Sequence, residues 1–282
     1  MKVIVNHCGK GIRMRTLIEP ELKELGYFQI DDKLEQIALI QKLFAKTYTF
    51  ENLDVLLKKD QPMNEAFLID KLLVQKRGGL CYELNGLLYL VLQAFGFDAI
   101  LGVGTVWSDQ KGWTLNKTHT IVLTYINNKM YLVDSGFGTN LSQRPIQVDG
   151  EPVTSRTGTF RLRTRKTKRG SILFEKLTKN GWTQRYAFYP DPVELEDLER
   201  VNKIIHEHPE SGFNKTPLIA KALDDGTVSI TDRRVNRTWI NEKGMEVKDE
   251  RIEFQHMNEM LQEIKRYASA STYKAAKKYM RK

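Results

Sequence analysis

The chain is poor in cysteine, with only Cys8 and Cys81 among its 282 residues. Two cysteines cannot build the disulfide framework on which many small secreted folds depend. Unpaired thiols are typical of a reducing compartment, so we expect a cytoplasmic protein. Its stability has to come from a hydrophobic core, and a hydrophobic content of 41% is ordinary for a globular protein that has one.

Long apolar runs are also missing. No stretch approaches the roughly 20 apolar residues that a membrane-spanning helix needs. The apolar stretch near the start is too short for a secretory signal peptide, and we expect no membrane partner. The length of 282 residues exceeds that of one typical core unit and indicates two or three subdomains.

Acidic residues are missing from one segment, residues 161–169, in a chain whose formal net charge is +9. A solvated hairpin tip explains such a cluster without any function. The functional alternatives are attraction of an anionic cofactor and binding of a nucleic acid. We expect no nucleic-acid partner, because the basic cluster is the only feature of the sequence that supports one. The six basic residues of the cluster are Arg161, Arg163, Arg165, Lys166, Lys168 and Arg169.

Helical periodicity dominates the first hundred residues. Asp32 and Asn64 stand where N-caps are expected, each before apolar residues at helical spacing. A further helix is predicted over residues 80–95, with Gly96 as its C-terminal cap. Apolar residues cover nearly its whole circumference, so we expect this helix in the middle of the core, with Cys81 in its first turn.

From about residue 98 the pattern changes to that of β-strands. β-branched and aromatic residues gather in short segments that are separated by Gly and Asn turns, which predicts an antiparallel sheet or a small barrel. The expected strands are 99–103, 120–126, 130–133 and 171–177. Hairpin-like units and a final amphipathic helix over 256–268 follow, so the last part of the chain is mixed.

Cys81 is a candidate nucleophile because of its position. It follows Gly78 and Gly79, which let the backbone turn sharply into the predicted helix. The first turn of a helix presents unpaired N–H groups and the positive end of the dipole, which favour a thiolate over a thiol. A thiolate at this place is a competent nucleophile.

A base and a carboxylate for this cysteine are predicted from a hairpin. His119 begins one expected strand and Asp134 ends the next, and the two strands are joined by Asn127 and Asn128. Asn tolerates the positive φ of a two-residue turn, and this turn places His119 diagonally across from Asp134 on the same face. A three-residue turn would put the two side chains on opposite faces. The hairpin therefore predicts a Cys81–His119–Asp134 triad.

Four segments resemble the arylamine N-acetyltransferase family. Residues 77–85 read Arg-Gly-Gly-Leu-Cys-Tyr-Glu-Leu-Asn, which is similar to the family's catalytic-cysteine motif. Residues 50–53 resemble its Phe-Glu-Asn-Leu segment, and residues 134–138 resemble its catalytic-aspartate loop. Residues 209–213 are similar to its Ser/Phe segment near coenzyme A. The resemblance covers roughly residues 20 to 230.

The resemblance implies an α+β fold with a cysteine-protease-like Cys-His-Asp core. Its parts would be an N-terminal helical bundle over residues 1–97, a central antiparallel β-barrel over 98–205 and a C-terminal α/β lid over 206–282. The bundle would supply the cysteine of the triad and the barrel its histidine and aspartate. The order of helices, strands and mixed elements expected along the chain agrees with this layout.

The resemblance also implies a ping-pong reaction with acetyl-CoA as co-substrate and no metal. Cys81 would accept the acetyl group, and the nitrogen of an arylamine or arylhydrazine would then receive it; O-acetylation of N-hydroxyarylamines is a related activity. Ser211 and Phe213 would contact coenzyme A, and Phe50 and Phe137 would line the acceptor pocket. Phe50 and Phe137 are alternatively ordinary core aromatics.

Some features depart from the family or have a simpler meaning. Thr49 stands where proline commonly precedes the Phe-Glu-Asn segment, and Ser135 stands where a small apolar residue is usual. Glu51 and Arg77 are expected to form a buried structural ion pair. A transglutaminase-like or papain-like cysteine hydrolase is the alternative function, because it uses the same order of Cys, His and Asp; it leaves the motif around the cysteine unexplained.

Overall fold

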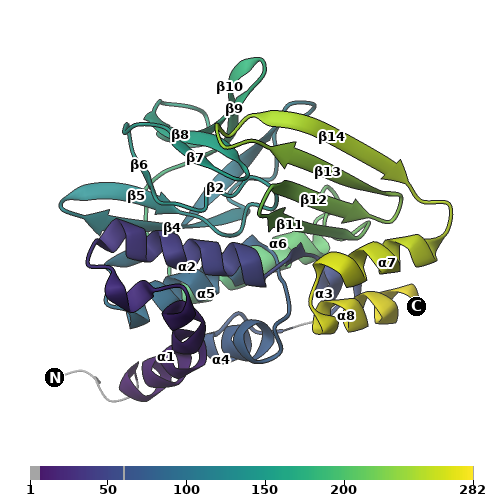
Figure 1. Ribbon diagram of the computed structural model, residues 1–282, viewed down its shortest axis with the longest axis horizontal. Helices are drawn as coiled ribbons and strands as arrows, with labels where there is room; N and C mark the ends of the chain where they lie inside the picture. The colour runs from purple at the N-terminus through teal and green to yellow at the C-terminus, as the bar shows by residue number, and fades with distance from the viewer. Residues whose placement is uncertain (1–6, 60, 282) are drawn as a thin grey trace.

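The computed structural model describes residues 7–59 and 61–281, and places helix α5 at the centre of the helical part (Figure 1). Helix α5 (Cys81–Ala94) buries Leu84, Leu87 and Val91 in the main core, where it packs on α1 (His7–Glu24) and the first sheet; α2 (Lys33–Thr47) contributes to the same core. Residues 81–88, 91 and 92 of the helix are buried, as expected for a helix in the middle of the core. The short helical elements of this part are η1 (Tyr27–Gln29), α3 (Leu53–Leu56), α4 (Glu65–Leu68) and the π-helix η2 (Ile69–Val74).

Local signals set the helix ends where they were expected. The Asp32 carboxylate accepts the N–H of Glu35 at 2.9 Å, and the Asn64 amide oxygen accepts the N–H of Phe67 at 3.0 Å. Both contacts satisfy N–H groups that a helix start leaves without a partner. Residues 1–6 lie outside the described residues. Among the residues that follow, Met14 and Ile18 are buried in the main core, so this part of the chain has a packing role.

The first sheet is a nearly closed antiparallel barrel, and the predicted antiparallel β-structure is confirmed. Its strands follow the order β6-β5-β4-β2-β10-β9-β8-β7, and a bridge between Val148, just after β6, and Leu162 on β8 brings the two sides of the sheet together. Aromatic and aliphatic side chains fill its interior. The strands are β2 (Ala99–Ser108), β3 (Gly112–Trp113), β4 (His119–Ile126), β5 (Lys129–Val133), β6 (Ile146–Gln147), β7 (Val153–Ser155), β8 (Gly158–Thr164), β9 (Ile172–Thr178) and β10 (Gly181–Phe188).

The second sheet combines the C-terminal strands with a strand from the helical part. Strand β1 (Phe50–Glu51) pairs with β11, so the order is β1-β11-β12-β13-β14. Helix α7 covers one face of this sheet, and α8 packs against α7 (Figure 1). Its other strands are β11 (Leu218–Leu223), β12 (Gly226–Thr231), β13 (Arg234–Ile240) and β14 (Glu246–Glu253). The remaining helices are η3 (Leu195–Asp197), α6 (Leu198–Glu207), α7 (Met257–Tyr267) and α8 (Ala270–Met280).

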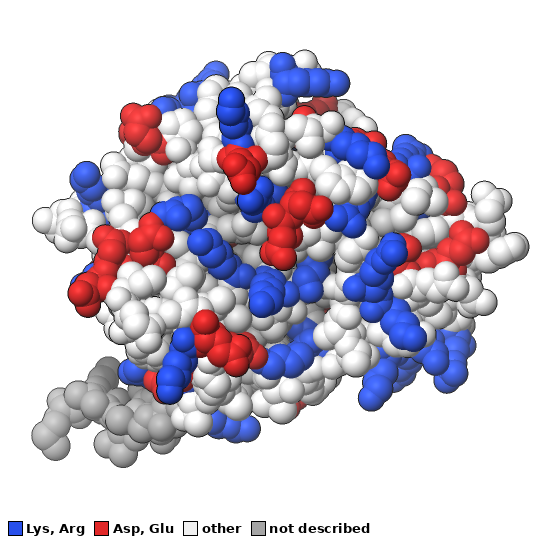
Figure 2. All heavy atoms as spheres, viewed as in Figure 1, with Lys and Arg blue, Asp and Glu red and all other residues white. Residues whose placement is uncertain are grey.

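The basic cluster lies on β8 and on the turn that leads into β9. Arg161 pairs with Glu175 at 2.7 Å, and Arg163 donates to the carbonyl of Gly150 at 3.0 Å. Arg165 and Lys166 are exposed. Figure 2 shows basic side chains spread over the face in view with acidic ones between them. Part of the cluster thus has structural partners, and the exposed part forms a hairpin turn.

No helix within residues 7–59 and 61–281 combines the length and the apolar character that crossing a membrane requires.

Candidate active site

Cys81 is the first residue of helix α5. The glycines before it allow the backbone to pass close to the Thr49 segment as it enters the helix. A Cβ on Gly78 would lie 2.2 Å from the carbonyl oxygen of Thr49, so only glycine fits there. The Cys81 side chain is 7% exposed, and its Sγ lies 3.5 Å from the carbonyl oxygen of Thr118. The thiol therefore faces the start of strand β4 from the end of a helix.

The hairpin between β4 and β5 has the predicted two-residue turn. Asn127 and Asn128 adopt φ values of 51° and 58°, and Ile126 pairs with Lys129. His119 Nε2 consequently lies 2.8 Å from the Asp134 carboxylate. The prediction that these side chains share one face of the hairpin is confirmed, because the two-residue turn sets the predicted pairing register of the two strands.

The Asp134 carboxylate is held by donors from four parts of the chain. Its Oδ1 accepts from the Asn85 side chain and from the Gly136 N–H, both at 2.8 Å. Its Oδ2 accepts from the Tyr186 hydroxyl at 2.9 Å, in addition to the imidazole of His119. Burial raises the pKa of Asp134, but His119 and these donors outweigh it and keep the pKa below its usual value. Asp134 is therefore a fixed anion beside the imidazole.

The pKa of His119 is raised by its two neighbours, Asp134 and Cys81. Burial alone would lower its pKa, but the negative charge of Asp134 and a hydrogen bond to it raise the pKa, and the Cys81 sulfur on the other side adds to this effect. The net result is a pKa of about 10. At neutral pH the imidazole is therefore protonated, which is the state that pairs with a thiolate.

The loop after Asp134 packs directly on the helix that carries Cys81. A Cβ on Gly136 would lie 2.8 Å from the Cα of Cys81 and 2.8 Å from the Asn85 amide nitrogen. The Asn85 side chain also accepts the N–H of Ser135 at 2.9 Å. Glycine at position 136 and asparagine at position 85 thus bring the barrel loop and helix α5 into contact.

Aromatic side chains surround the triad. The Phe137 ring lies 4.7 Å from the His119 ring and 5.0 Å from the Tyr186 ring. Phe50 and Phe213 meet edge to face at 5.7 Å. Phe50 also lies near Gly138, since a Cβ there would come within 3.9 Å of its ring. The two phenylalanines expected at the acceptor pocket therefore both border the segment that follows Asp134.

Ser211 has a structural contact in this conformation. Its side chain is 2% exposed, and its hydroxyl donates to the carbonyl of Ile205 at 2.7 Å. This bond satisfies a carbonyl near the end of α6, and it leaves only the hydroxyl lone pairs and the backbone for a ligand. Phe213 is half-buried beside Phe50.

The family model described as N-acetyltransferase matches residues 33–266 of this chain. An uncharacterized acetyltransferase of Bacillus subtilis, YvcN, is 37% identical over 223 residues, which cover 79% of this chain and 88% of the relative. A probable arylamine N-acetyltransferase of Dictyostelium discoideum is 30% identical over 226 residues, which cover 70% of this chain and 72% of the relative. The chain belongs to the arylamine N-acetyltransferase family. This membership leaves the cysteine-hydrolase alternative without support, because the match extends far beyond the triad.

Two solved arylamine N-acetyltransferases illustrate the likeness. The Bacillus cereus protein is 35% identical, with a TM-score of 0.73 over 81% of this chain and 88% of its own. It is described as having a Cys-His-Glu triad, whereas the carboxylate beside His119 in this chain is that of Asp134. The Mycobacterium marinum protein, solved in complex with CoA, is 23% identical, with a TM-score of 0.73 over 86% of this chain and 92% of its own. The second likeness concerns the fold alone.

A buried network of charges lies next to the candidate site, at the start of helix α5. The Glu83 carboxylate accepts the N–H of Leu80 at 2.9 Å and pairs with Lys71. Lys71 also pairs with Asp54 at 2.9 Å. The capping contact of Glu83 fixes the backbone just before Cys81, so the network holds the start of α5.

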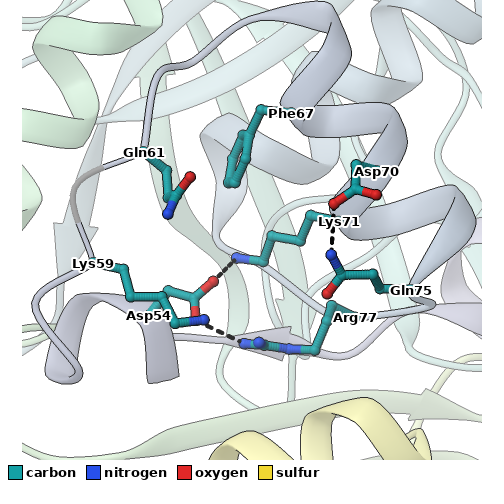
Figure 3. A pocket seen from close by; sticks show the side chains of 8 residues that line it. All are labelled: Asp54, Lys59, Gln61, Phe67, Asp70, Lys71, Gln75 and Arg77. Carbon is teal, nitrogen blue, oxygen red and sulfur yellow. Dashed lines mark hydrogen bonds and ion pairs between the residues drawn. The ribbon is translucent and has the colours of Figure 1, made fainter.

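The network continues to an opening on the helical side of the molecule. Arg77 pairs with Glu51 at 2.6 Å, which confirms the predicted buried ion pair, and with Asp54 at 3.1 Å. Figure 3 shows Asp54 between Lys71 and Arg77 at the wall of a pocket with about 110 Å³ of space for water-sized occupants. Lys59 Nζ also pairs with the Asp54 carboxylate, at 2.8 Å.

Lys71→Met is expected to destabilise the protein by about 3–5 kcal/mol, because it leaves the buried Glu83 carboxylate without its cation, whereas Asp54 keeps Arg77 and Lys59. Lys59→Met is the matched control, since Lys59 pairs with Asp54 alone and its side chain is 34% exposed. Its expected effect is at most about 1 kcal/mol. Urea unfolding of both variants measures the difference; equal midpoints would show that Lys71 has no structural role.

Sequence reasoning missed three supporting residues of the site. Asn85 lies in the cysteine motif, four residues after Cys81 and on the same helix face, so its spacing was a usable signal. Tyr186 and Lys71 offered no such signal, because each reaches the site through tertiary packing. Across residues 7–59 and 61–281 the structure contains no cluster of three His, Cys, Asp or Glu side chains suited to a metal ion.

Proposed function

We propose that Cys81 carries the acetyl group from acetyl-CoA to the nitrogen of an arylamine or arylhydrazine, with His119 as proton carrier and Asp134 as the group that orients it. The observation that carries this proposal is the contact of His119 with Asp134 at 2.8 Å on one side and with the Cys81 sulfur on the other. Nucleophilic catalysis by cysteine requires this arrangement.

The first half-reaction loads the enzyme. The Cys81 thiolate attacks the thioester carbonyl of acetyl-CoA, the bond from that carbonyl to the CoA sulfur breaks, and CoA leaves with a proton from the His119 imidazolium. The product is acetyl-Cys81 and neutral His119. The negative charge of Asp134 keeps the imidazolium stable until the proton is transferred.

The second half-reaction transfers the acetyl group. The acceptor nitrogen attacks the carbonyl of acetyl-Cys81, its proton passes to His119, and the Cys81 thiolate leaves. N-hydroxyarylamines would react at oxygen by the same steps. Because CoA departs before the acceptor reacts, the scheme is ping-pong.

The proposed binding residues are Phe50 and Phe137 for the acceptor and Ser211 and Phe213 for CoA. Phe137 at 4.7 Å from His119 supports a ring contact close to the reacting atoms. The edge-to-face contact of Phe50 with Phe213 supports a shared boundary between the two substrates. Membership in the arylamine N-acetyltransferase family supports acetyl-CoA as the acetyl donor. The proposed compartment is the cytoplasm, because Cys81 has to remain a thiol.

Incubation with acetyl-CoA alone tests the proposal. The intact mass should rise by one acetyl group, and peptide mapping should place it on Cys81, since the loaded enzyme has no acceptor to react with. Addition of an arylamine such as 4-methoxyaniline should restore the original mass. An unchanged mass in the first step would rule out the acyl-enzyme.

A further inference from the structure

Asn52 stands at the start of helix α3, but its side chain caps nothing there. An asparagine at this position ordinarily accepts an N–H group of its own helix. Here the Glu51 carboxylate accepts the N–H of Leu53 instead, at 2.7 Å. The Asn52 side chain is 1% exposed and is directed to a distant part of the chain.

The Asn52 amide forms three hydrogen bonds to the backbone just before and at the start of β11. Its Nδ2 donates to the carbonyls of Phe213 and Thr216, both at 2.8 Å. Its Oδ1 accepts the N–H of Leu218 at 2.8 Å. Within the described part of the chain, the two carbonyls accept no other hydrogen bond. Asn52 therefore uses both of its donors and its acceptor to hold the turn that leads from Phe213 into β11.

The same turn is attached to helix α6 from its other side. The Asn214 amide donates to the carbonyls of His206 and His208, both at 3.0 Å. This contact fixes the turn to the end of α6. Asn52 adds the connection to the segment that carries Phe50, which lies two residues before it.

The segment that carries Asn52 also borders the turn before Cys81. The N–H of Glu51 donates to the carbonyl of Gly79 at 3.0 Å, and the N–H of Gly79 donates to the carbonyl of Thr49 at 3.1 Å. On its other edge, β1 pairs with β11. This short strand therefore lies between the turn that enters α5 and the strand that follows the Asn52 contacts.

We propose that Asn52 is a positioning residue for acetyl-CoA, which holds Phe213 against Phe50 at the edge of the site. The inference rests on the proposed function, in which Phe213 contacts CoA. Because Asn52 holds the Phe213 carbonyl and the Phe213 ring meets Phe50 at 5.7 Å, loss of the amide donors releases the ring from this position. The hydrogen bonds of Asn52 do not involve the triad, so the chemistry at Cys81 should be unchanged.

The experiment follows acetylation of Cys81 by acetyl-CoA without an acceptor, by intact mass in rapidly quenched samples. Asn52→Ala should raise the acetyl-CoA concentration at half-saturation by about 5- to 30-fold, the effect expected from one or two lost hydrogen bonds. Asn52→Asp keeps the acceptor for Leu218 but neither donor, and should behave in the same way. The rate at saturation and the rate of inactivation by iodoacetamide should stay near their wild-type values. An unchanged half-saturation in both variants would overturn the inference.

A double-mutant cycle with Phe213→Ala tests whether Asn52 acts through this ring. Phe213→Ala should raise the half-saturation by itself, and adding Asn52→Ala should then have little further effect, because the ring that it positions is absent. Effects of the two substitutions that multiply would contradict the inference. So would an unchanged half-saturation in Phe213→Ala, which decides the question even if the Asn52 variants do not fold.

Asn64→Ala is the matched control, because Asn64 also holds a backbone group, the N–H of Phe67 in the helical part. The substitution weakens a helix cap without changing the contacts of Phe213, so the half-saturation should stay at the wild-type value. Urea unfolding gives the stability of each variant. A rise in half-saturation that follows stability, in Asn64→Ala as in Asn52→Ala, would show that instability and not positioning is responsible.

Failure of this inference is distinguishable from failure of the proposed function. If wild-type protein becomes acetylated on Cys81 and the Asn52 variants need no more acetyl-CoA than wild type does, only the role of Asn52 is wrong. If wild-type protein does not become acetylated at any concentration of acetyl-CoA, the proposed function itself is wrong.

Discussion

Cys81→Ser is expected to abolish acetyl transfer while the protein stays folded. Serine differs from cysteine by one atom, and its hydroxyl can donate to the carbonyl of Thr118, which lies 3.5 Å from Sγ, so the buried site keeps its shape. A hydroxyl is a far weaker nucleophile than a thiolate at neutral pH. Loss of the nucleophile from a serine protease triad costs about six orders of magnitude in turnover, and we expect a loss of at least roughly four here.

Cys8→Ser is the control for this variant, because it removes the other cysteine of the chain. It should retain full turnover and the single acetyl adduct, whereas Cys81→Ser should show neither. Thermal unfolding of both proteins verifies that they fold. Turnover within tenfold of wild type in Cys81→Ser would remove Cys81 from the mechanism.

Asp134→Asn is expected to lower turnover by about two to four orders of magnitude. The equivalent change in a serine triad costs roughly four orders, because the imidazole is left in the wrong tautomer. A cysteine enzyme loses less if a thiolate–imidazolium pair exists before the substrate binds. Asp134 is the main reason why the pKa of His119 is raised, so its neutral replacement lowers that pKa and weakens the pair.

The sharper readout for Asp134→Asn is alkylation of the thiol. Inactivation by iodoacetamide near neutral pH should slow in parallel with turnover, since both depend on protonated His119 stabilising a thiolate at Cys81. The pH profile of inactivation should move to higher pH. Lost turnover with an unchanged alkylation profile would show that Asp134 acts only on the fold.

Tyr186→Phe tests how much the orientation of the Asp134 carboxylate contributes to turnover, as distinct from its charge. It removes one donor to Asp134 and leaves the carboxylate and its contact with His119 in place. The expected loss of turnover is therefore smaller, about tenfold, and the alkylation profile should hardly move. The free energy of unfolding, measured for both variants, identifies any part of the loss that is due to instability.

Local sequence signals determined much of this protein. The side-chain period of a strand and the Asn127–Asn128 turn are properties of neighbouring residues, so the register that joins His119 to Asp134 was predictable. The caps at Asp32 and Asn64 and the position of Cys81 at the start of α5 follow from equally local rules. The order of helices, antiparallel strands and mixed elements was predictable for the same reason.

Tertiary structure alone decided the contacts between distant segments. Cys81 meets His119 because Gly136 lets the barrel loop pack on α5, a contact across 55 residues of chain. Pairing of β1 with β11 places Phe50 beside Phe213, although the sequence assigned the first of them to a purely helical region. Helix α8 was not expected either, because it has few large apolar residues and is stabilised by packing against α7 and α3.

The polar contacts around the site were likewise decided by the tertiary structure. That Lys71 neutralises Glu83 and that Tyr186 donates to Asp134 both depend on how separate elements pack around one another. A lysine in a sequence is most often an exposed side chain, and no local pattern distinguishes a buried one. Local periodicity sets which face a residue lies on, whereas the folded barrel decides what that face contacts.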